Sequence, residues 1–116
     1  METKESMKAK ELREQLKETG EKYYEVTITL QVDDDTEEDK TYFFHKPKTP
    51  SYDRYLKTVS TSSSKALSAF CQDNICSEQK EVLKADFEEY PAIALSIGEK
   101  LLAMLGLSKT TAVKKL

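Results

Sequence analysis

The segment from Pro91 to Leu107 constrains the fold more than any other part of the chain, because its apolar residues cover far more than one face of a helix. Placed at about 100° per residue, they fall in one arc of about 200°, whereas the apolar stripe of an ordinary surface helix spans about 100°. Such a helix either lies between two layers of its own protein or docks on a partner. Ile97 and Leu101 lie near the middle of the arc and are expected in the core. Leu95 and Leu102 lie at its edges and are expected to face a partner, so Leu102→Asp should leave the monomer folded.

Length and composition indicate one soluble, globular domain over residues 1–116. A chain of 116 residues that is 38% hydrophobic and 34% charged, with 3 Gly and 3 Pro, can bury a single modest core. The net charge of −3 argues against a nucleic-acid partner, which usually requires a strong basic excess. The first residues show no signal-peptide pattern, and Glu99 and Lys100 interrupt the longest apolar stretch. We therefore expect a cytoplasmic protein with no membrane partner.

The two ends of the chain predict weakly attached segments. Residues 4–19 favour a helix that ends at Gly20, but the apolar stripe of this helix is thin. We therefore expect residues 1–20 to attach loosely, or to need a neighbour or a second copy of the protein. Residues 108–116 are too polar and too few to pack firmly, so we expect a flexible tail.

An alternating segment and its return predict an antiparallel β-hairpin. From Tyr23 to Val32, apolar and polar residues alternate, which is typical of a strand with one buried face. The acidic segment that ends at Asp39 is expected to form the turn, and residues 40–46 the second strand. Because an isolated two-stranded hairpin is only marginally stable, helices or a second sheet must cover its apolar face.

The chain beyond the hairpin reads as short helices separated by polar connectors. Pro47 and Pro50 mark a break between the second strand and the helices, because a proline disfavours helical backbone in the residue before it. The predicted fold class is therefore α+β, with an N-terminal helix and an antiparallel β-hairpin followed by a bundle of about four short α-helices. Helix N-caps are expected at Thr49, at the end of the connector 60–64 and at Ser77, the last helix is expected to begin with Pro91 as its first residue, and a stop is expected at Gly106.

Candidate catalytic and metal-binding residues are few, and none forms a recognisable motif. His45 is the single histidine, and no nucleophile or orienting carboxylate accompanies it, so a structural histidine is the preferred interpretation. With Cys71 and Cys76 it could supply three zinc ligands, but the paired close spacing of zinc sites is absent. The acidic segment 33–39 lacks the glycine of a calcium loop. We expect no enzyme activity, no metal and no cofactor.

The two cysteines and a group of aromatic residues are expected to serve the fold rather than a binding site. Cys71 and Cys76 lie five residues apart in one helical pattern and point away from each other, so we expect reduced thiols, with Cys71 buried. Aromatic residues are interleaved with lysines and an arginine over residues 42–57, which is typical of proteins that stack single-stranded bases. The neighbouring acidic segment would repel a phosphate backbone, so we expect most of these rings to pack in the core.

The run from Tyr23 to about Ser108 resembles a group of small siphophage and prophage proteins related to tail assembly chaperones. The strand that ends Tyr-Phe-Phe-His-Lys-Pro at Pro47 carries part of the resemblance. A helix with Tyr52, Arg54 and Tyr55 follows it, and then come the segments KALSAFCQDNIC and FEEYPAIALSIGEKLLAML. What recurs is the order of an aromatic strand, a Lys-Pro break and helices.

The resemblance implies a non-enzymatic chaperone that binds the tape measure protein, or another tail protein, in the host cytoplasm during tail morphogenesis. The alternative is a phage or bacterial adaptor or regulatory protein that binds one folded protein partner. Several copies would cover one client. The protein could also form a homo-oligomer in this role. The family has no fixed functional residues to transfer. On physical grounds alone, we nominate five protein-binding residues: Leu95, Leu102, Leu105, Tyr52 and Tyr55.

Overall fold

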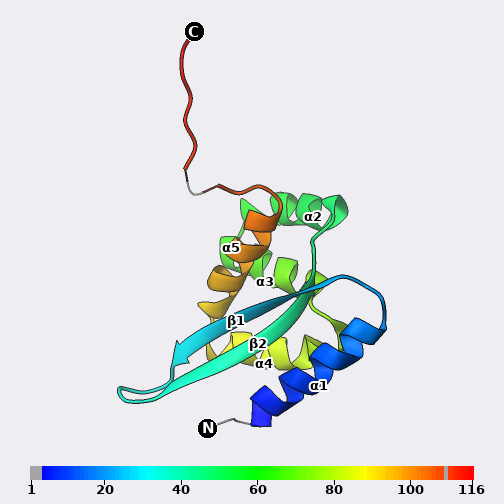
Figure 1. Ribbon diagram of the computed structural model, residues 1–116. Helices are drawn as coiled ribbons and strands as arrows, with labels where there is room; N and C mark the ends of the chain where they lie inside the picture. Colours follow the sequence, from blue (N-terminus) through cyan, green and yellow to red (C-terminus); the bar gives the residue numbers. More distant parts are fainter. Residues whose placement is uncertain (1–3, 109) are drawn as a thin grey trace.

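The computed structural model describes residues 4–108 and 110–116, with burial described from Ala9 onward. It has the predicted α+β architecture, in which an N-terminal helix and an antiparallel hairpin precede a group of short helices (Figure 1). In chain order the elements are α1 (Lys4–Glu18), β1 (Tyr23–Gln31), β2 (Glu37–His45), α2 (Thr49–Val59), α3 (Ser63–Asn74), the 3-10 helix η1 (Ser77–Gln79), α4 (Lys80–Glu89) and α5 (Ile93–Met104).

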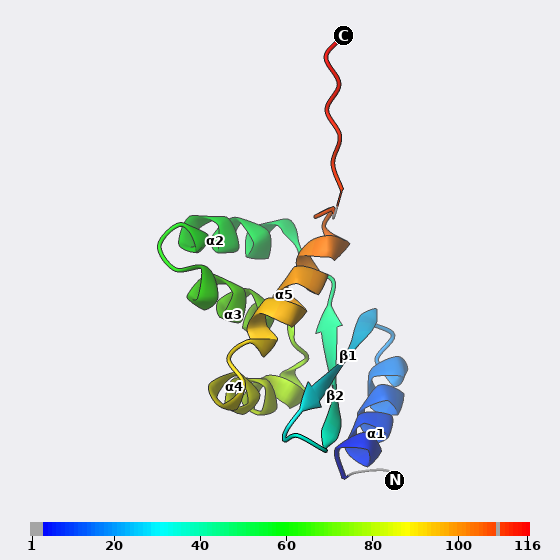
Figure 2. The ribbon, with the colours of Figure 1, turned by 90° about the vertical axis from the view of Figure 1, so that its left-hand side faces the viewer.

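The hairpin is the middle layer of the molecule. In Figure 2, α2 to α5 lie on one side of the two strands and α1 lies on the other. The strand alternation explains this arrangement, because successive side chains point to opposite faces. Tyr42 and Phe44 of β2 are 1% and 0% exposed within the core formed with the helices. Phe43 points to the opposite face and packs in a second cluster with Ala9 and Leu16 of α1.

The turn of the hairpin is shorter than predicted. The N–H of Val32 donates to the carbonyl oxygen of Thr36 at 3.0 Å, so β2 begins at Glu37 and not after Asp39. The sequence interpretation missed this because it assigned every acidic residue to the turn. Asp39 is instead opposite Thr29, whose hydroxyl donates to its carboxylate at 2.7 Å on the exposed side of the pair.

The residues predicted to cap or begin the helices agree with the structure only in part. A serine of the connector 60–64 caps α3, but the cap is Ser62 and not the last residue of the connector, since the hydroxyl of Ser62 accepts from the N–H of Lys65 and α3 begins at Ser63. The predicted caps at Thr49 and Ser77 were wrong, because Lys48 is the N-cap of α2 and Ser77 already lies inside η1. Pro91 was also wrong as the first helical residue, since α5 begins two residues later at Ile93.

The C-terminal end of α5 is the Schellman stop that the sequence predicts. Gly106 has φ of +109°, a conformation that side chains with a Cβ rarely adopt. The N–H of Leu107 donates to the carbonyl oxygen of Leu102, and that of Gly106 to the carbonyl oxygen of Ala103. The chain therefore turns away from the helix axis at this point. In the part of the chain that the structure describes, none of the helices is long and apolar enough to cross a membrane.

Helix α5 lies between layers, as its wide apolar arc requires. Ile97 and Leu101 are fully buried, which confirms their predicted place in the core. Leu102 is only 9% exposed and belongs to the same cluster. The predicted partner-facing position of Leu102 is therefore wrong, and we now expect Leu102→Asp to destabilise the monomer, because the variant would bury a carboxylate among apolar side chains.

Candidate functional site: an apolar groove between α2 and α5

An apolar groove of about 860 Å³ opens where α2, α3, α5 and the segment after β2 meet. Most of its lining atoms belong to aliphatic and aromatic side chains, and one cation and one carboxylate lie among them. We refer to this feature as the α2–α5 groove. Its lining consists of Pro47, Lys48, Thr49, Tyr52, Tyr55, Leu67, Leu95, Glu99, Leu102, Leu105, Gly106 and Leu107.

All five residues nominated from the sequence line this groove. Tyr52 and Tyr55 come from α2, with ring centroids 6.3 Å apart in a stacked arrangement. Leu95 and Leu102 come from α5, and Leu105 is the residue that caps the C-terminal end of this helix. The structure thus brings together side chains that are about 50 residues apart in the sequence, although their binding role remains a prediction.

The five residues contribute unequally to an accessible surface. Leu95 is 52% exposed, so its side chain is available to a partner. Tyr52, Tyr55 and Leu105 are half-buried and pack against the main core cluster. Leu102 is buried, so it forms part of the groove floor rather than an exposed contact.

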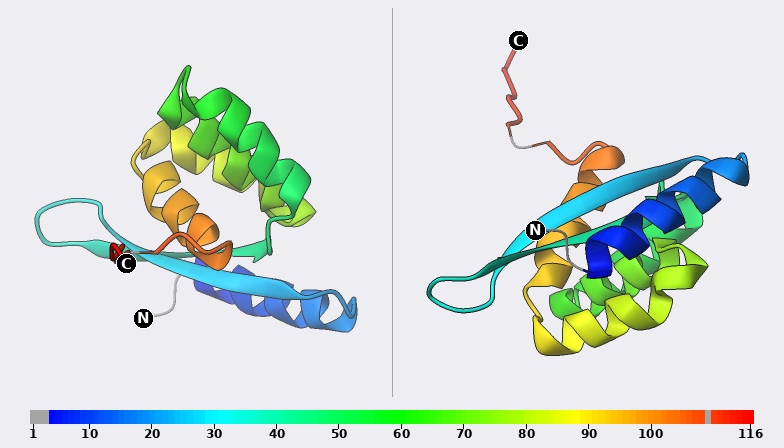
Figure 3. Two further views of the ribbon diagram at one scale, coloured as in Figure 1. Left: turned by 90° about the horizontal axis from the view of Figure 1, so that it is seen from above. Right: turned by 60° about the horizontal axis from the view of Figure 1, so that its bottom comes forward.

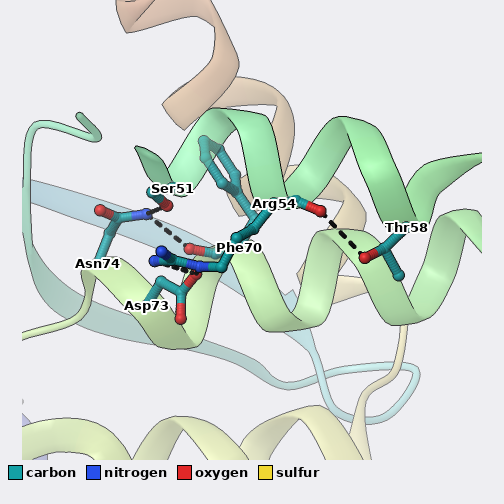
Figure 4. Close-up of polar contacts among 6 residues, drawn as sticks. All are labelled: Ser51, Arg54, Thr58, Phe70, Asp73 and Asn74. Carbon is teal, nitrogen blue, oxygen red and sulfur yellow. Dashed lines mark hydrogen bonds and ion pairs between the residues drawn. The ribbon is translucent and has the colours of Figure 1, made fainter. Parts of the chain in front are cut away.

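Polar contacts hold α2 against α3 and so fix the tyrosine wall of the groove (Figure 4). The guanidinium of Arg54 donates from Nε and Nη2 to one carboxylate oxygen of Asp73, at 3.2 and 3.1 Å. The amide of Asn74 donates to the hydroxyl of Ser51 at 2.9 Å and to the carbonyl oxygen of Phe70 at 2.7 Å. The Ser51–Asn74 pair is buried, where an unmade hydrogen bond is costly. It therefore specifies how α2 is placed.

Helix α3 is the floor between the two walls. Phe70 packs on the ring of Tyr55 with a centroid distance of 5.3 Å. On the other side, α5 approaches α3 at Gly98, where an added Cβ would lie only 2.6 Å from Cδ2 of Leu67. A glycine at this position allows the close approach that places Leu67 in the groove floor.

The charges of the groove are sparse and of both signs. Lys48 and Glu99 are exposed, and they lie among a lining that is otherwise mainly aliphatic and aromatic. The groove offers no cluster of acids and bases for chemistry on a substrate. Its chemistry suits a partner that presents an apolar surface, flanked by charges of either sign.

A second cavity, of about 330 Å³, contains a buried polar cluster that the sequence interpretation missed. Lys40 is 8% exposed, and its Nζ lies 3.4 Å from a carboxylate oxygen of Asp86 on α4. The hydroxyl of Tyr42 donates to the other oxygen of that carboxylate at 2.5 Å. A lysine in step with Tyr42 and Phe44 on the inward face of β2 was the signal available in the sequence. The cluster joins the hairpin to α4.

The other chemically notable residues are engaged in the fold. His45 packs against Tyr23 with ring centroids 4.3 Å apart. Cys71 and Cys76 are both buried and free, but Cys76 lies beyond the end of α3 and not in the same helix as predicted. Among the residues that the structure describes, no three His, Cys, Asp or Glu side chains gather closely enough to hold a metal ion. Asp33 in the hairpin turn accepts from the N–H of Asp35, which lowers the pKa of its carboxyl.

Comparisons with known proteins place the chain in a family. The solved structure of an uncharacterised protein, rbstp2171, from Bacillus stearothermophilus is similar to this chain, with a TM-score of 0.73 and 24% sequence identity. The match covers 88% of this chain and 99% of the other, and it shows the fold alone. No curated protein matches the sequence. A family model described as "Domain of unknown function (DUF6848)" matches residues 12–114, so the chain belongs to the DUF6848 family.

Proposed function

We propose that the protein is a non-enzymatic chaperone that covers apolar stripes on a helical client. The observation that carries this proposal is the α2–α5 groove, in which all five nominated residues gather around an open, mainly apolar surface. Grooves of this composition bind the apolar face of an amphipathic helix through residues spaced three or four apart. Leu95, which is half-exposed at the edge of the arc, is the contact most accessible to such a client.

The client we name is the tape measure protein of a phage tail, and this part of the proposal rests on the sequence resemblance. A tape measure protein is a long helical chain, and its apolar stripes would aggregate if they were left bare. A small acidic protein with one groove could cover a short length of such a chain, so several copies would bind each client. The excess negative charge of the copies would then keep the complex dissolved.

Co-expression with the cognate tape measure protein tests the proposal. We expect the soluble yield of the client to rise and several copies of the chaperone to bind each client molecule. Binding should depend little on salt, because the groove is mainly apolar. Leu95→Asp places a charge in the groove and should lower the soluble yield of the client.

Leu56→Asp is the matched control for this experiment. Leu56 is 47% exposed on α2, close to the exposure of Leu95, but it does not line the groove. Circular dichroism should show both variants to be folded. If the client stays insoluble with the wild-type protein, or if both variants lower its yield equally, the chaperone proposal fails. Capture of one folded partner in a one-to-one complex would favour the adaptor alternative.

A further inference from the structure

The two edges of the hairpin differ in how their backbone groups are satisfied. The outer edge of β2 is covered by the segment around η1. The N–H of Phe43 donates to the side-chain oxygen of Gln79 at 2.8 Å, and the Gln79 amide donates to the carbonyl oxygen of Thr41 at 2.9 Å. The N–H of Cys76 donates to the carbonyl oxygen of Phe43 at 2.9 Å. No further strand can pair at these positions.

These contacts also fix which residues of β1 point to its own outer edge. Phe43 and Thr41 direct their backbone groups away from β1, so their partners in the register form non-hydrogen-bonded pairs. Those partners are Glu25 and Thr27, whose N–H and C=O groups must therefore point away from β2. The same holds for each odd-numbered residue of β1. Within the residues that the structure describes, no hydrogen bond reaches these groups from another element.

The open edge of β1 carries an incompletely covered apolar surface. Val26, Ile28 and Leu30 face the helical layer but remain half-exposed, whereas Tyr42 and Phe44 on the same face of β2 are fully buried. In the right-hand view of Figure 3, β1 forms the upper border of the hairpin, and α1 and α4 lie below it. The strand contains no proline or glycine, residues that usually interrupt pairing at an exposed edge.

We propose that β1 pairs antiparallel with β1 of a second copy, which joins the two hairpins into one four-stranded sheet. The nine residues of β1 are centred on Thr27, so Thr27 of one copy faces Thr27 of the other on a two-fold axis. Glu25 then faces Thr29, and Tyr23 faces Gln31. In this register every odd-numbered residue exchanges both backbone hydrogen bonds, and no like charges face each other.

Self-complementarity favours a second copy over an unrelated strand. The even-numbered residues place Val26 opposite Ile28 and Tyr24 opposite Leu30, so each apolar side chain gains an apolar neighbour. The pairing is isologous, because the same edge is used by both copies. Since Gln79 and Cys76 occupy the outward-pointing groups of Thr41 and Phe43, a further strand is blocked at the middle of β2. The assembly closes as a dimer.

Sedimentation equilibrium of the 116-residue chain, over about 1 to 100 µM, tests this interface. Thr27→Lys places two lysines beside each other on the axis, and we expect it to raise the dimer dissociation constant by at least about tenfold. Thr29→Lys is the charge-matched control, because its lysine would face Glu25 of the other copy and retain the dimer. Thr27→Pro removes an outward-pointing backbone donor and the exposed hydroxyl that contacts the hydroxyl of Thr41, but no backbone hydrogen bond between β1 and β2, so it should abolish dimerisation and leave the hairpin paired.

Hydrogen exchange provides a second measurement that is specific to the register. In the wild-type dimer the amides of Glu25, Thr27 and Thr29 should exchange slowly, and in Thr27→Lys they should exchange as fast as exposed amides. Circular dichroism checks that each lysine variant is folded, so the test stands even if Thr27→Pro fails to fold. A wild-type protein that is monomeric throughout this range, or lysine variants that weaken the dimer equally, would overturn the proposal. The measurements need no client and are independent of the α2–α5 groove.

Discussion

Cys71 lies where α3 meets α5, and its surroundings determine the chemistry of its thiol. The side chain is fully buried in the core cluster, and its sulfur lies 3.9 Å from the carbonyl oxygen of Ala94. Burial raises the pKa of Cys71 to about 12, because a thiolate at this point would have little solvation. Burial also raises the pKa of Cys76 to about 11. Both residues therefore act as small apolar side chains at neutral pH.

The raised pKa of Cys71 makes the stability of the fold depend on alkaline pH. In the unfolded chain the thiol ionises near its ordinary pKa of 9.0, whereas in the folded protein it ionises near 12. Its contribution to stability is therefore complete below pH 9 and is lost as pH rises from 9 towards 12. Urea unfolding between pH 8 and 10 should show a steeper fall in the free energy of unfolding for the wild-type protein than for Cys71→Ala. Parallel curves for the two proteins would contradict the burial of this thiol.

At single positions, the sequence pattern predicted buried apolar residues better than buried polar ones. Ile97, Leu101 and Cys71 were correctly assigned to the core, because helical spacing places them on one face. The charge of Lys40 is typical of a surface residue, although its position in the strand is inward and its side chain is buried. Its burial depends on Asp86, which lies 46 residues away in the sequence. A contact of that kind becomes visible only when the tertiary arrangement is known.

Among the helices, the approach of α5 to α3 determines the shape of the α2–α5 groove. Gly98 lies in the middle of α5 with ordinary helical backbone, so its role is to provide space rather than a special conformation. The side chain of Leu67 fills the position next to it and also lines the groove. Close packing at this crossing therefore connects the core with the candidate site.

Gly98→Val tests this connection. The new Cβ would lie 2.6 Å from Cδ2 of Leu67, so that side chain or α5 must shift. Overpacking of this kind typically costs about 1–3 kcal/mol, and we expect the free energy of unfolding in urea to fall by that amount. Ala103→Val is the control, since it adds a branched side chain at an exposed position of the same helix. Equal effects of the two substitutions would show that helix propensity, and not the crossing, is responsible.

The elements themselves were largely predictable, whereas their ends were not. Hydrophobic periodicity gave the hairpin and the helices because each buries one regular face. The start of β2 was missed because Glu37 and Glu38 pair with β1 despite their charge. Leu95, Leu102 and Leu105 of the groove were nominated from the flank of the apolar arc, but a groove between them and α2 was not predicted. Its closure by α2 depends on the Arg54–Asp73 and Ser51–Asn74 contacts, which no local pattern indicates.

At the scale of the whole molecule, the layer order predicts that the two ends of the chain contribute unequally to stability. Helix α1 covers Phe43 on the outer face of the hairpin, and Ala9 and Leu16 are buried in that contact. Arg13 adds an exposed ion pair with Glu25 at 2.6 Å, a contact of small energetic value at the surface. Residues 110–116 are exposed throughout and lie away from the body of the molecule (Figure 1).

Deletion of residues 1–20 should therefore destabilise the protein, whereas deletion of residues 109–116 should not. Loss of α1 exposes the apolar ring of Phe43, for which the expected cost is about 2 kcal/mol or more. The shortened protein should bind a hydrophobic dye and melt at a lower temperature. The deletion at the other end should change the free energy of unfolding by less than about 0.5 kcal/mol. Thermal unfolding of the two truncated proteins measures both effects, and a variant without α1 that melts like the wild-type protein would show that this helix is a loosely attached segment and not a layer of the fold.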